Sequence, residues 1–330
     1  MIDTIYIENS VLKHPRSQKI LARFPKAQQI LCERYSEVFN PKAQNFRLQK
    51  QKPALILAQK YGQKVLPIPN TYGIGGENNY YFSHMLNCVY DCRYCFLQGM
   101  YSSANYVLFV NYEDFIDEIK TTAKPEQSNW FFSGYDCDSL ALDPLTQFLD
   151  FILDFFSQQS NLFLELRTKS TQIRGLLNRK PSKNVITAFS FTPDKIARAL
   201  EHGAPNIQKR IAAMHKLAAL GWPVGIRLDP MIDYPDYQQD YKELIQQLFS
   251  GLNTNALHSI SLGNFRLPTA YYKTLAKLYP DEPLFATDLV QSGGIVSYGE
   301  QREKMMLQYC TEQLLQHTST EKLYACEIYN

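Results

Sequence analysis

The chain has 330 residues, and its 34 Lys and Arg nearly balance its 32 Asp and Glu, which leaves a formal net charge of +2. The 22 Tyr and 19 Phe supply ample apolar surface for a packed core and exclude a disordered chain. No apolar run reaches the roughly 18–20 residues that span a bilayer, and the first residues do not resemble a secretory signal, so we expect a cytoplasmic protein with no membrane partner.

The length allows one large α/β domain or two small ones. Seven cysteines are an odd number for a chain without a signal peptide, and this argues against a disulfide framework. Cys32, Cys310 and Cys326 are isolated in the sequence, and we expect them to be ordinary thiols.

Residues 1–75 are predicted to form a basic N-terminal region whose structure is mostly helical or mixed. Between Lys13 and Lys64 there are twelve Lys and Arg against two Glu. Such an excess fits a nucleic-acid surface, and it equally fits helix faces that point at water. Few aromatic residues interleave with the charges, which favours the solvated faces.

From residue 76 onward, strand-like and helix-like segments alternate. The expected strands are 80–86, 128–133, 161–167, 184–191, 223–229 and 257–262, and the expected helices are 112–122, 144–157, 205–220 and 236–250. Six such repeats predict a parallel sheet that curls into a full or partial barrel over residues 76–265. Residues 266–330 are predicted to be a C-terminal extension that covers the barrel, with a neutral hairpin at 292–299.

Polar and reactive residues follow the expected strands at their C-terminal ends, where barrel enzymes carry their chemistry. They are the cysteines after 80–86, Ser133-Gly134-Tyr135, Lys169, Ser190 and Asp229. We therefore expect these residues to line one rim of the sheet.

The most specific motif is Cys88-x3-Cys92-x2-Cys95. Three thiolates on one loop can bind three irons of a [4Fe–4S] cluster and leave the fourth iron open for chemistry. The alternatives are a zinc site with His84 as a fourth ligand, and three unliganded thiols. The absence of a second CxxC pair in the sequence makes zinc the weaker choice.

This motif, with Tyr94 before its last cysteine, resembles the signature of radical S-adenosylmethionine (SAM) enzymes. Cys92-Arg-Tyr-Cys95-Phe-Leu-Gln98 is similar to the spore photoproduct lyase family in particular. Matches in the same order along the chain include 5–8, 167–169, 189–191, 201–210 and 228–230.

The resemblance implies a partial (β/α)6 barrel, a [4Fe–4S] cluster and SAM, whose cleavage yields a 5′-deoxyadenosyl radical that attacks the substrate. It implies that Tyr94, Lys169 and Ser190 contact SAM, and we add Ser133 and Gly134 at the same rim as candidates. A flavodoxin- or ferredoxin-type protein is the expected electron donor.

The chain departs from the lyase pattern at its radical relay. Alignment through Asp143-Pro144 puts Tyr135 at the position of the hydrogen-donor cysteine, and Cys137 lies two residues beyond it. Phe96 stands where the family has a second tyrosine, and phenylalanine has no O–H to lose. Cys137 and Tyr135 are thus the candidate catalytic residues, with a packed thiol as the alternative for Cys137.

The segment between Lys277 and Arg302 contains no Lys or Arg, although the resemblance predicts a basic hairpin that contacts DNA. Three functions follow from these observations. The first is carbon–carbon lyase repair of a thymine-dimer-type DNA lesion, and the second is a radical SAM reaction on RNA, a peptide or a small molecule. The third is a zinc-bound nucleic-acid-binding protein.

Overall fold

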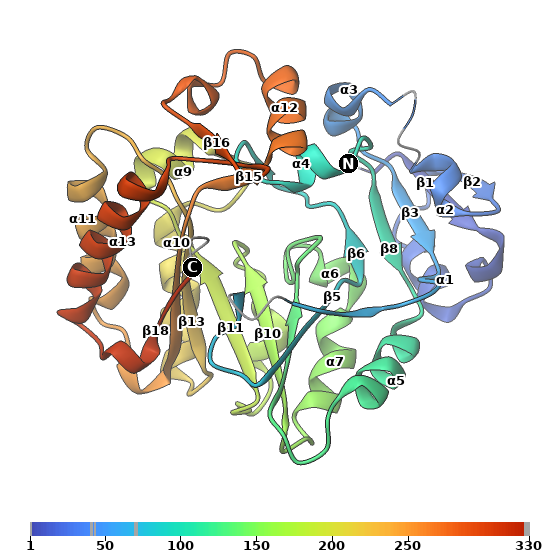
Figure 1. The fold of residues 1–330 in the computed structure, drawn as a ribbon. Helices are drawn as coiled ribbons and strands as arrows, with labels where there is room; N and C mark the ends of the chain where they lie inside the picture. The colour runs from blue at the N-terminus through green and yellow to red at the C-terminus, as the bar shows by residue number, and fades with distance from the viewer. Residues whose placement is uncertain (1, 40–41, 43, 69–71, 327–330) are drawn as a thin grey trace.

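An eight-stranded sheet, curled into a partial barrel, forms the centre of the molecule (Figure 1). The computed structural model describes residues 2–39, 42, 44–68 and 72–326. The strand order is β18 (Leu323–Ala325), β14 (Leu257–Asn264), β13 (Val224–Met231), β11 (Val185–Ser190), β10 (Leu162–Thr168), β9 (Asn129–Ser133), β5 (Asn78–Phe82) and β4 (Val65–Pro67).

The six strands from β5 to β14 all run parallel, which confirms the predicted partial barrel. The predicted strand 80–86 is divided into β5 and β6 (Met85–Leu86), and β6 belongs to a different sheet. The predicted helix 144–157 is likewise divided, because Gln147 adopts a left-handed conformation with φ 51°. A helix cannot continue through such a residue.

The second sheet has five strands in the order β2 (Gln28–Cys32), β1 (Thr4–Glu8), β3 (Leu55–Ala58), β8 (Tyr106–Phe109) and β6. Sheet pairing therefore crosses the expected boundary at residue 75 in both directions. β4 from the N-terminal region joins the barrel sheet, and β6 and β8 join the N-terminal sheet. Of the two structures expected for residues 1–75, the mixed one is found, because the described part of this region contains four strands and short helices. The three-region division stays a prediction.

The structure also contains two smaller sheets. β7 (Asp91–Cys92) pairs with β12 (Glu201–His202), and β15 (Arg266–Pro268) pairs with β17 (Ile295–Ser297), which pairs with β16 (Val290–Ser292). The antiparallel pairing of β16 and β17 is the hairpin expected from the sequence.

The helices of eight residues or more are α5 (Tyr112–Thr122), α7 (Phe148–Phe156), α10 (Ile207–Ala219), α11 (Tyr237–Phe249), α12 (Thr269–Leu278) and α13 (Glu300–Leu315). The shorter ones are α1 (Pro15–Leu21), α2 (Tyr35–Val38), α3 (Phe46–Gln51), α4 (Leu97–Met100), α6 (Asp143–Thr146), α8 (Arg174–Leu177) and α9 (Asp194–Leu200). Helix α10 begins where the Asn206 side chain accepts a hydrogen bond from the Lys209 amide at 3.0 Å.

The barrel strands are buried on both faces. On β10, Leu162, Leu164 and Leu166 face the outer helices and belong to the main core, whereas Phe163 packs inside the curl. The rings of Phe163 and Trp130 lie 4.7 Å apart there. Residues 163, 165 and 167 therefore share the inner face, because strand side chains alternate.

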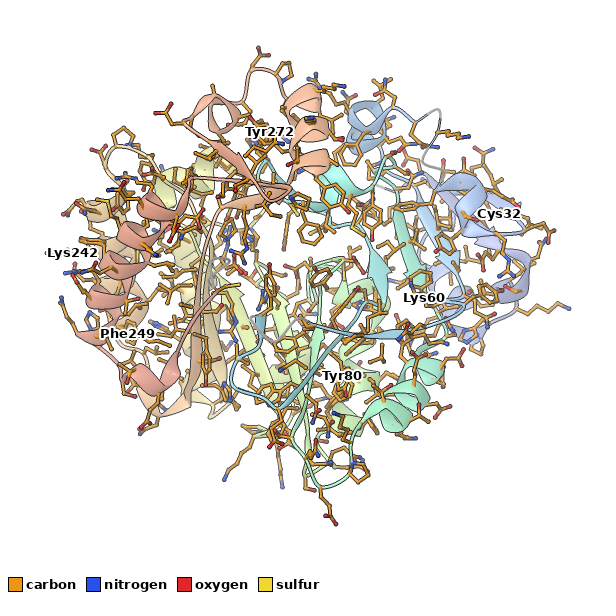
Figure 2. All side chains as sticks on the ribbon, viewed as in Figure 1. Cys32, Lys60, Tyr80, Lys242, Phe249 and Tyr272 are labelled. Carbon is orange, nitrogen blue, oxygen red and sulfur yellow. The ribbon has the colours of Figure 1, made fainter. Side chains whose placement is uncertain are left out.

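Side chains pack between the sheets and the helices that surround them (Figure 2). Lys242 extends from α11 at the surface of the same view. Among the helices that the structure describes, none combines the length and the apolar character that crossing a membrane requires. The seven cysteines form no disulfide with one another.

Candidate functional site

The three motif cysteines lie on the loop between β6 and α4. Cys92 is buried, and Cys88 and Cys95 are half-buried. Contacts from β12, from α3 and from the adjoining helix α4 hold this loop. β7 pairs with β12 so that Cys92 lies opposite Glu201, and the Arg93 amide donates to the Leu200 carbonyl at 2.8 Å.

The other two contacts satisfy carbonyl groups of the loop. Gln98 Nε2 donates to the Cys92 carbonyl at 2.6 Å. Lys50 Nζ, from α3, donates to the carbonyls of Cys88 and Tyr90 at 2.9 and 3.1 Å. These hydrogen bonds fix the backbone of the loop, and the fixed backbone in turn fixes the positions of the three cysteines.

The donor set fits an iron–sulfur cluster. Burial raises the pKa of Cys88 to about 12 and raises the pKa of Cys92 and of Cys95, so the metal-free thiols are protonated at neutral pH and would release protons on binding iron. In the described part of the chain, no three His, Cys, Asp or Glu side chains converge to hold one metal ion. Cluster cysteines bind separate irons and do not need to converge.

The zinc alternative depended on His84, and the structure places this residue elsewhere. The His84 ring is 1% exposed and stacks on Phe148 with ring centroids 3.9 Å apart. Burial lowers its pKa to about 3. His84 is thus a neutral core residue, which does not support a zinc site with the three cysteines.

Glu201 is the centre of a buried polar cluster beside the cysteine loop. Its carboxylate accepts hydrogen bonds from the Tyr94 hydroxyl, from Thr192 Oγ1 at 3.0 Å and from Arg210 Nη2 at 2.5 Å. Burial opposes the charged carboxylate, but Lys169 and Arg210 outweigh it and hold the pKa of Glu201 below its usual value. Glu201 therefore stays ionised and orients the residues around it.

Lys169 and Ser190 meet this cluster from the rim of the sheet. Lys169 Nζ lies 5.5 Å from the centroid of the Tyr94 ring. Ser190 is buried, and its carbonyl accepts a hydrogen bond from Arg210 Nη1 at 3.1 Å. The structure thus brings Tyr94, Lys169 and Ser190 together, as expected for one binding site.

Ser133 is the last residue of β9, and Gly134 follows it at the same rim. Gly134 has φ 88°, and a Cβ there would lie 2.4 Å from Ser139 Oγ, so only glycine fits. Asp138 then ties the following loop to β10, because its carboxylate accepts from Thr168 Oγ1 at 2.7 Å and from the Lys169 amide at 2.6 Å. The β9 loop and Lys169 are therefore positioned as one unit.

The two candidate catalytic residues differ in exposure. Tyr135 is 46% exposed, and its ring lies 4.4 Å from Tyr81 and 5.5 Å from Phe96. Cys137 is 7% exposed, and burial, with Cys88 as the next cause, raises the pKa of its thiol. Cys137 therefore keeps its S–H at neutral pH.

Part of the basic N-terminal charge is used inside the fold. Arg16 forms two hydrogen bonds with Glu113 at 2.6 and 2.7 Å, Lys64 pairs with Glu118 at 3.6 Å, and Arg34 lies over the Tyr61 ring. Arg16, Lys64 and Lys50 thus join the N-terminal region to later segments of the chain, whereas Arg34 stays within it.

Glu201, Asp138 and Lys50 were not identified as site residues from the sequence. Each is an ordinary charged residue with no spacing motif, so no local signal marks it. Glu201 falls within the 201–210 match to the family, which was the one available indication.

The chain resembles known proteins over nearly its whole length. The family model for spore photoproduct lyase matches residues 1–316. The spore photoproduct lyase of Bacillus subtilis is 25% identical over 289 residues, covering 85% of this chain and 83% of the relative. That of Clostridium acetobutylicum is 21% identical over 210 residues, covering 62% of each.

Solved structures show the same fold. A spore photoproduct lyase variant with bound AdoMet and dinucleoside spore photoproduct has a TM-score of 0.86 at 18% identity, covering 100% of this chain and 99% of that one. A spore photoproduct lyase complexed with dinucleoside spore photoproduct has a TM-score of 0.83 at 17% identity, covering 99% and 98%. On the family match, this chain belongs to the spore photoproduct lyase family of radical SAM enzymes.

Proposed function

We propose that the protein binds a [4Fe–4S] cluster through Cys88, Cys92 and Cys95 and uses SAM to repair a thymine-dimer-type lesion in DNA. The observation that carries this proposal is the cysteine loop, which is held by Gln98, Lys50 and the pairing of Cys92 with Glu201 next to the rim of the barrel. The relatives that are lyases of the spore photoproduct support the choice of DNA as substrate.

The residues at the rim have separate tasks in this proposal. Lys169 supplies a cation for the carboxylate of SAM, and buried Glu201 holds both Lys169 and Tyr94 in place. Ser133, Gly134 and Ser190 form the wall against which SAM lies. When bound and reduced by a flavodoxin- or ferredoxin-type partner in the cytoplasm, the cluster supplies the electron that cleaves SAM.

Cys137 is the better candidate for returning a hydrogen atom to the repaired substrate. Its protonated thiol has an S–H to give, and it lies on the β9 loop that also carries Ser133 and Gly134. Tyr135 is the alternative donor, with an O–H that is accessible to solvent.

The proposal is tested by anaerobic reconstitution with iron and sulfide, followed by reductant and SAM. We expect 5′-deoxyadenosine to form, and to form faster with ultraviolet-irradiated DNA than with unirradiated DNA. Cys92→Ala should abolish this product, and Cys310→Ala is the matched control because Cys310 is also buried but lies on α13.

Two outcomes contradict parts of the proposal. Failure to take up iron and sulfide rejects the cluster. If 5′-deoxyadenosine forms at the same rate with and without irradiated DNA, DNA is not the substrate, and a radical SAM reaction on another molecule remains. Cys137→Ala and Tyr135→Phe then identify the hydrogen donor, because loss of the true donor changes the distribution of repair products.

A further inference from the structure

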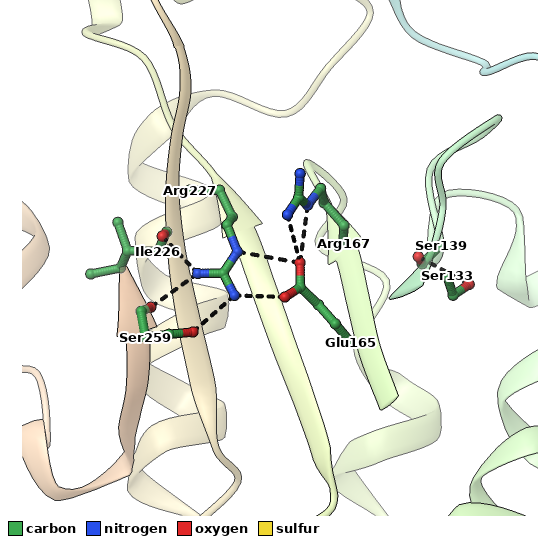
Figure 3. Close-up of polar contacts among 7 residues, drawn as sticks. All are labelled: Ser133, Ser139, Glu165, Arg167, Ile226, Arg227 and Ser259. Carbon is green, nitrogen blue, oxygen red and sulfur yellow. Dashed lines mark hydrogen bonds and ion pairs between the residues drawn. The ribbon is translucent and has the colours of Figure 1, made fainter. Parts of the chain in front are cut away.

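A buried ion pair lies inside the curl of the barrel, below the rim (Figure 3). Arg227, on β13, donates to both oxygens of Glu165, on β10, with Nη2 at 2.7 Å and Nε at 3.2 Å. Both side chains are fully buried. Arg227 also donates to the Ser259 hydroxyl and carbonyl at 2.9 and 3.1 Å, so its hydrogen bonds are satisfied within the protein.

The sequence makes room for this pair. Gly225 on β13 and Ala188 on β11 are paired neighbours, and glycine has no Cβ while alanine ends at Cβ. A Cβ on Gly225 would lie 2.8 Å from Arg227 Nη2. Small residues at this level leave space for guanidinium groups within a curl that is otherwise filled by rings such as Trp130 and Phe163.

Arg167 is a second arginine on the same carboxylate. Its Nε and Nη2 both lie 3.0 Å from Glu165 Oε1. Within the described residues the Arg167 guanidinium has no other hydrogen-bond partner, and 35% of the side chain is exposed. In Figure 3 the guanidinium lies beyond Glu165, with one end directed away from it. One carboxylate thus holds two arginines, and only Arg227 is enclosed.

The charges around this group do not cancel. Arg266 and Asp229 form a pair at 3.8 Å near Arg167, and burial lowers the pKa of His258 to about 4, so its ring is neutral. Burial also raises the pKa of the Cys326 thiol. Among the residues that the structure describes here, three arginines therefore face two carboxylates, which leaves one positive charge. Because 35% of the Arg167 side chain is exposed, this positive charge is accessible to an anion.

Arg167 also stands in the right place for a ligand. It is two residues before Lys169 on the inner face of β10, so it lies just below the rim that carries the proposed SAM site. We propose that the free end of Arg167 binds an oxyanion of the substrate, held ready by Glu165 and Arg227. A guanidinium fork suits phosphate or carboxylate oxygens. This inference rests on the proposed function in taking the barrel as the substrate site.

For a DNA lesion the oxyanion is the phosphodiester between the two nucleosides. The test uses reconstituted enzyme with SAM and no reductant, so that binding is measured without turnover. The probes are a spore photoproduct dinucleotide and the corresponding dinucleoside, which lacks the phosphate. Isothermal titration calorimetry gives each Kd.

We expect wild type to bind the dinucleotide about 10- to 100-fold more tightly than the dinucleoside, as for loss of a hydrogen bond to a charged group. Arg167→Gln should remove this preference and leave dinucleoside binding unchanged. Arg198→Gln, which removes an exposed arginine on α9, is the matched control and should keep the preference. Equal weakening of both probes by Arg167→Gln, or no effect on either, overturns the inference.

Two further measurements keep the test decisive. Arg167→Lys retains the charge, so it should retain part of the preference even if Arg167→Gln folds poorly. If wild type binds neither probe, the DNA proposal fails, and inorganic phosphate and acetate then test Arg167 alone. A larger rise of Tm in wild type than in Arg167→Gln with either anion supports an oxyanion site for a small molecule, and equal shifts reject it.

Discussion

The ionisable ring of His84 is buried in the core, where the neutral form is favoured over the imidazolium. Its pKa of about 3 lies below the ordinary value of 6.5, because burial penalises the imidazolium. The native state therefore binds fewer protons than the unfolded state between these two values. The unfolding free energy that depends on neutral His84 is fully present above pH 6.5 and decreases as the pH falls toward 3.

We predict that wild type loses about 2 kcal/mol of unfolding free energy from His84 between pH 7 and pH 5. His84→Phe keeps a ring to stack on Phe148 and removes the titration, so the variant should lose that much less over the same interval. Urea unfolding at the two pH values measures the difference. An identical loss in both proteins would contradict the prediction.

Glu201 holds together the buried polar residues beside the cysteine loop, which are Tyr94, Thr192 and Arg210. Removing one member of a buried pair leaves the other charge uncompensated, so Glu201→Gln should lower the unfolding free energy of the metal-free protein by about 3 kcal/mol. Thr192→Val removes one hydrogen bond to the same carboxylate and should cost about 1 kcal/mol. Equal costs, measured by urea unfolding, would show that the Arg210 pair is not the main contribution.

At the scale of elements, helix α12 covers the cysteine loop through an unusually close contact with α4. A Cβ on Gly99 would lie 2.6 and 2.7 Å from Cβ and Cα of Tyr271. The same interface carries a hydrogen bond from the Tyr279 hydroxyl to Gln98 Oε1 at 2.5 Å. Gly99 thus permits α12 to reach the residue that binds the Cys92 carbonyl.

Gly99→Ala should therefore push α12 away and destabilise the protein by about 1–3 kcal/mol. Gly175→Ala is the matched control on α8, because the nearest atom to its new Cβ is the flexible end of Leu149 at 3.1 Å. Thermal unfolding and limited proteolysis of residues 266–298 measure the effect. Unchanged stability and protection in Gly99→Ala would show that this contact is not close in solution.

Some elements follow directly from the periodicity of the sequence, and others do not. The helix at 205–220 was predicted well, because Ile207, Met214 and Ala218 recur at the helical period and are all buried. The strand expected at 80–86 was one element in the sequence but two in the structure, since no residue type marks the change of sheet after Phe82. Pairing partners decide that division.

At the scale of the whole molecule, the N-terminal sheet and the barrel meet at the cysteine loop. Lys50 donates from α3 to two loop carbonyls, so it links the basic N-terminal region to the proposed cluster site. The position of the loop thus depends on residues far away in the chain.

We predict that Lys50→Met speeds the loss of iron from the reconstituted protein about fivefold or more, because at least one net hydrogen bond of roughly 1 kcal/mol is lost. Lys52→Met is the control, since the Lys52 side chain is 83% exposed. Transfer of iron to a chelator measures both rates. Equal rates in the two variants would show that the loop does not need Lys50.

The sequence by itself determined the family and the fold class. Cys88, Cys92 and Cys95 lie within eight residues, and the six strand repeats are local patterns, so no tertiary information was needed to recognise either. Only the tertiary structure decided which charges surround the cysteine loop and the inner face of the sheet. Lys50, Glu201 and Arg227 come from separate segments, and Glu165 and Arg167 share β10. Glu201, Lys50 and Arg227 reach their partners only when strand pairing and long-range contacts bring these segments together.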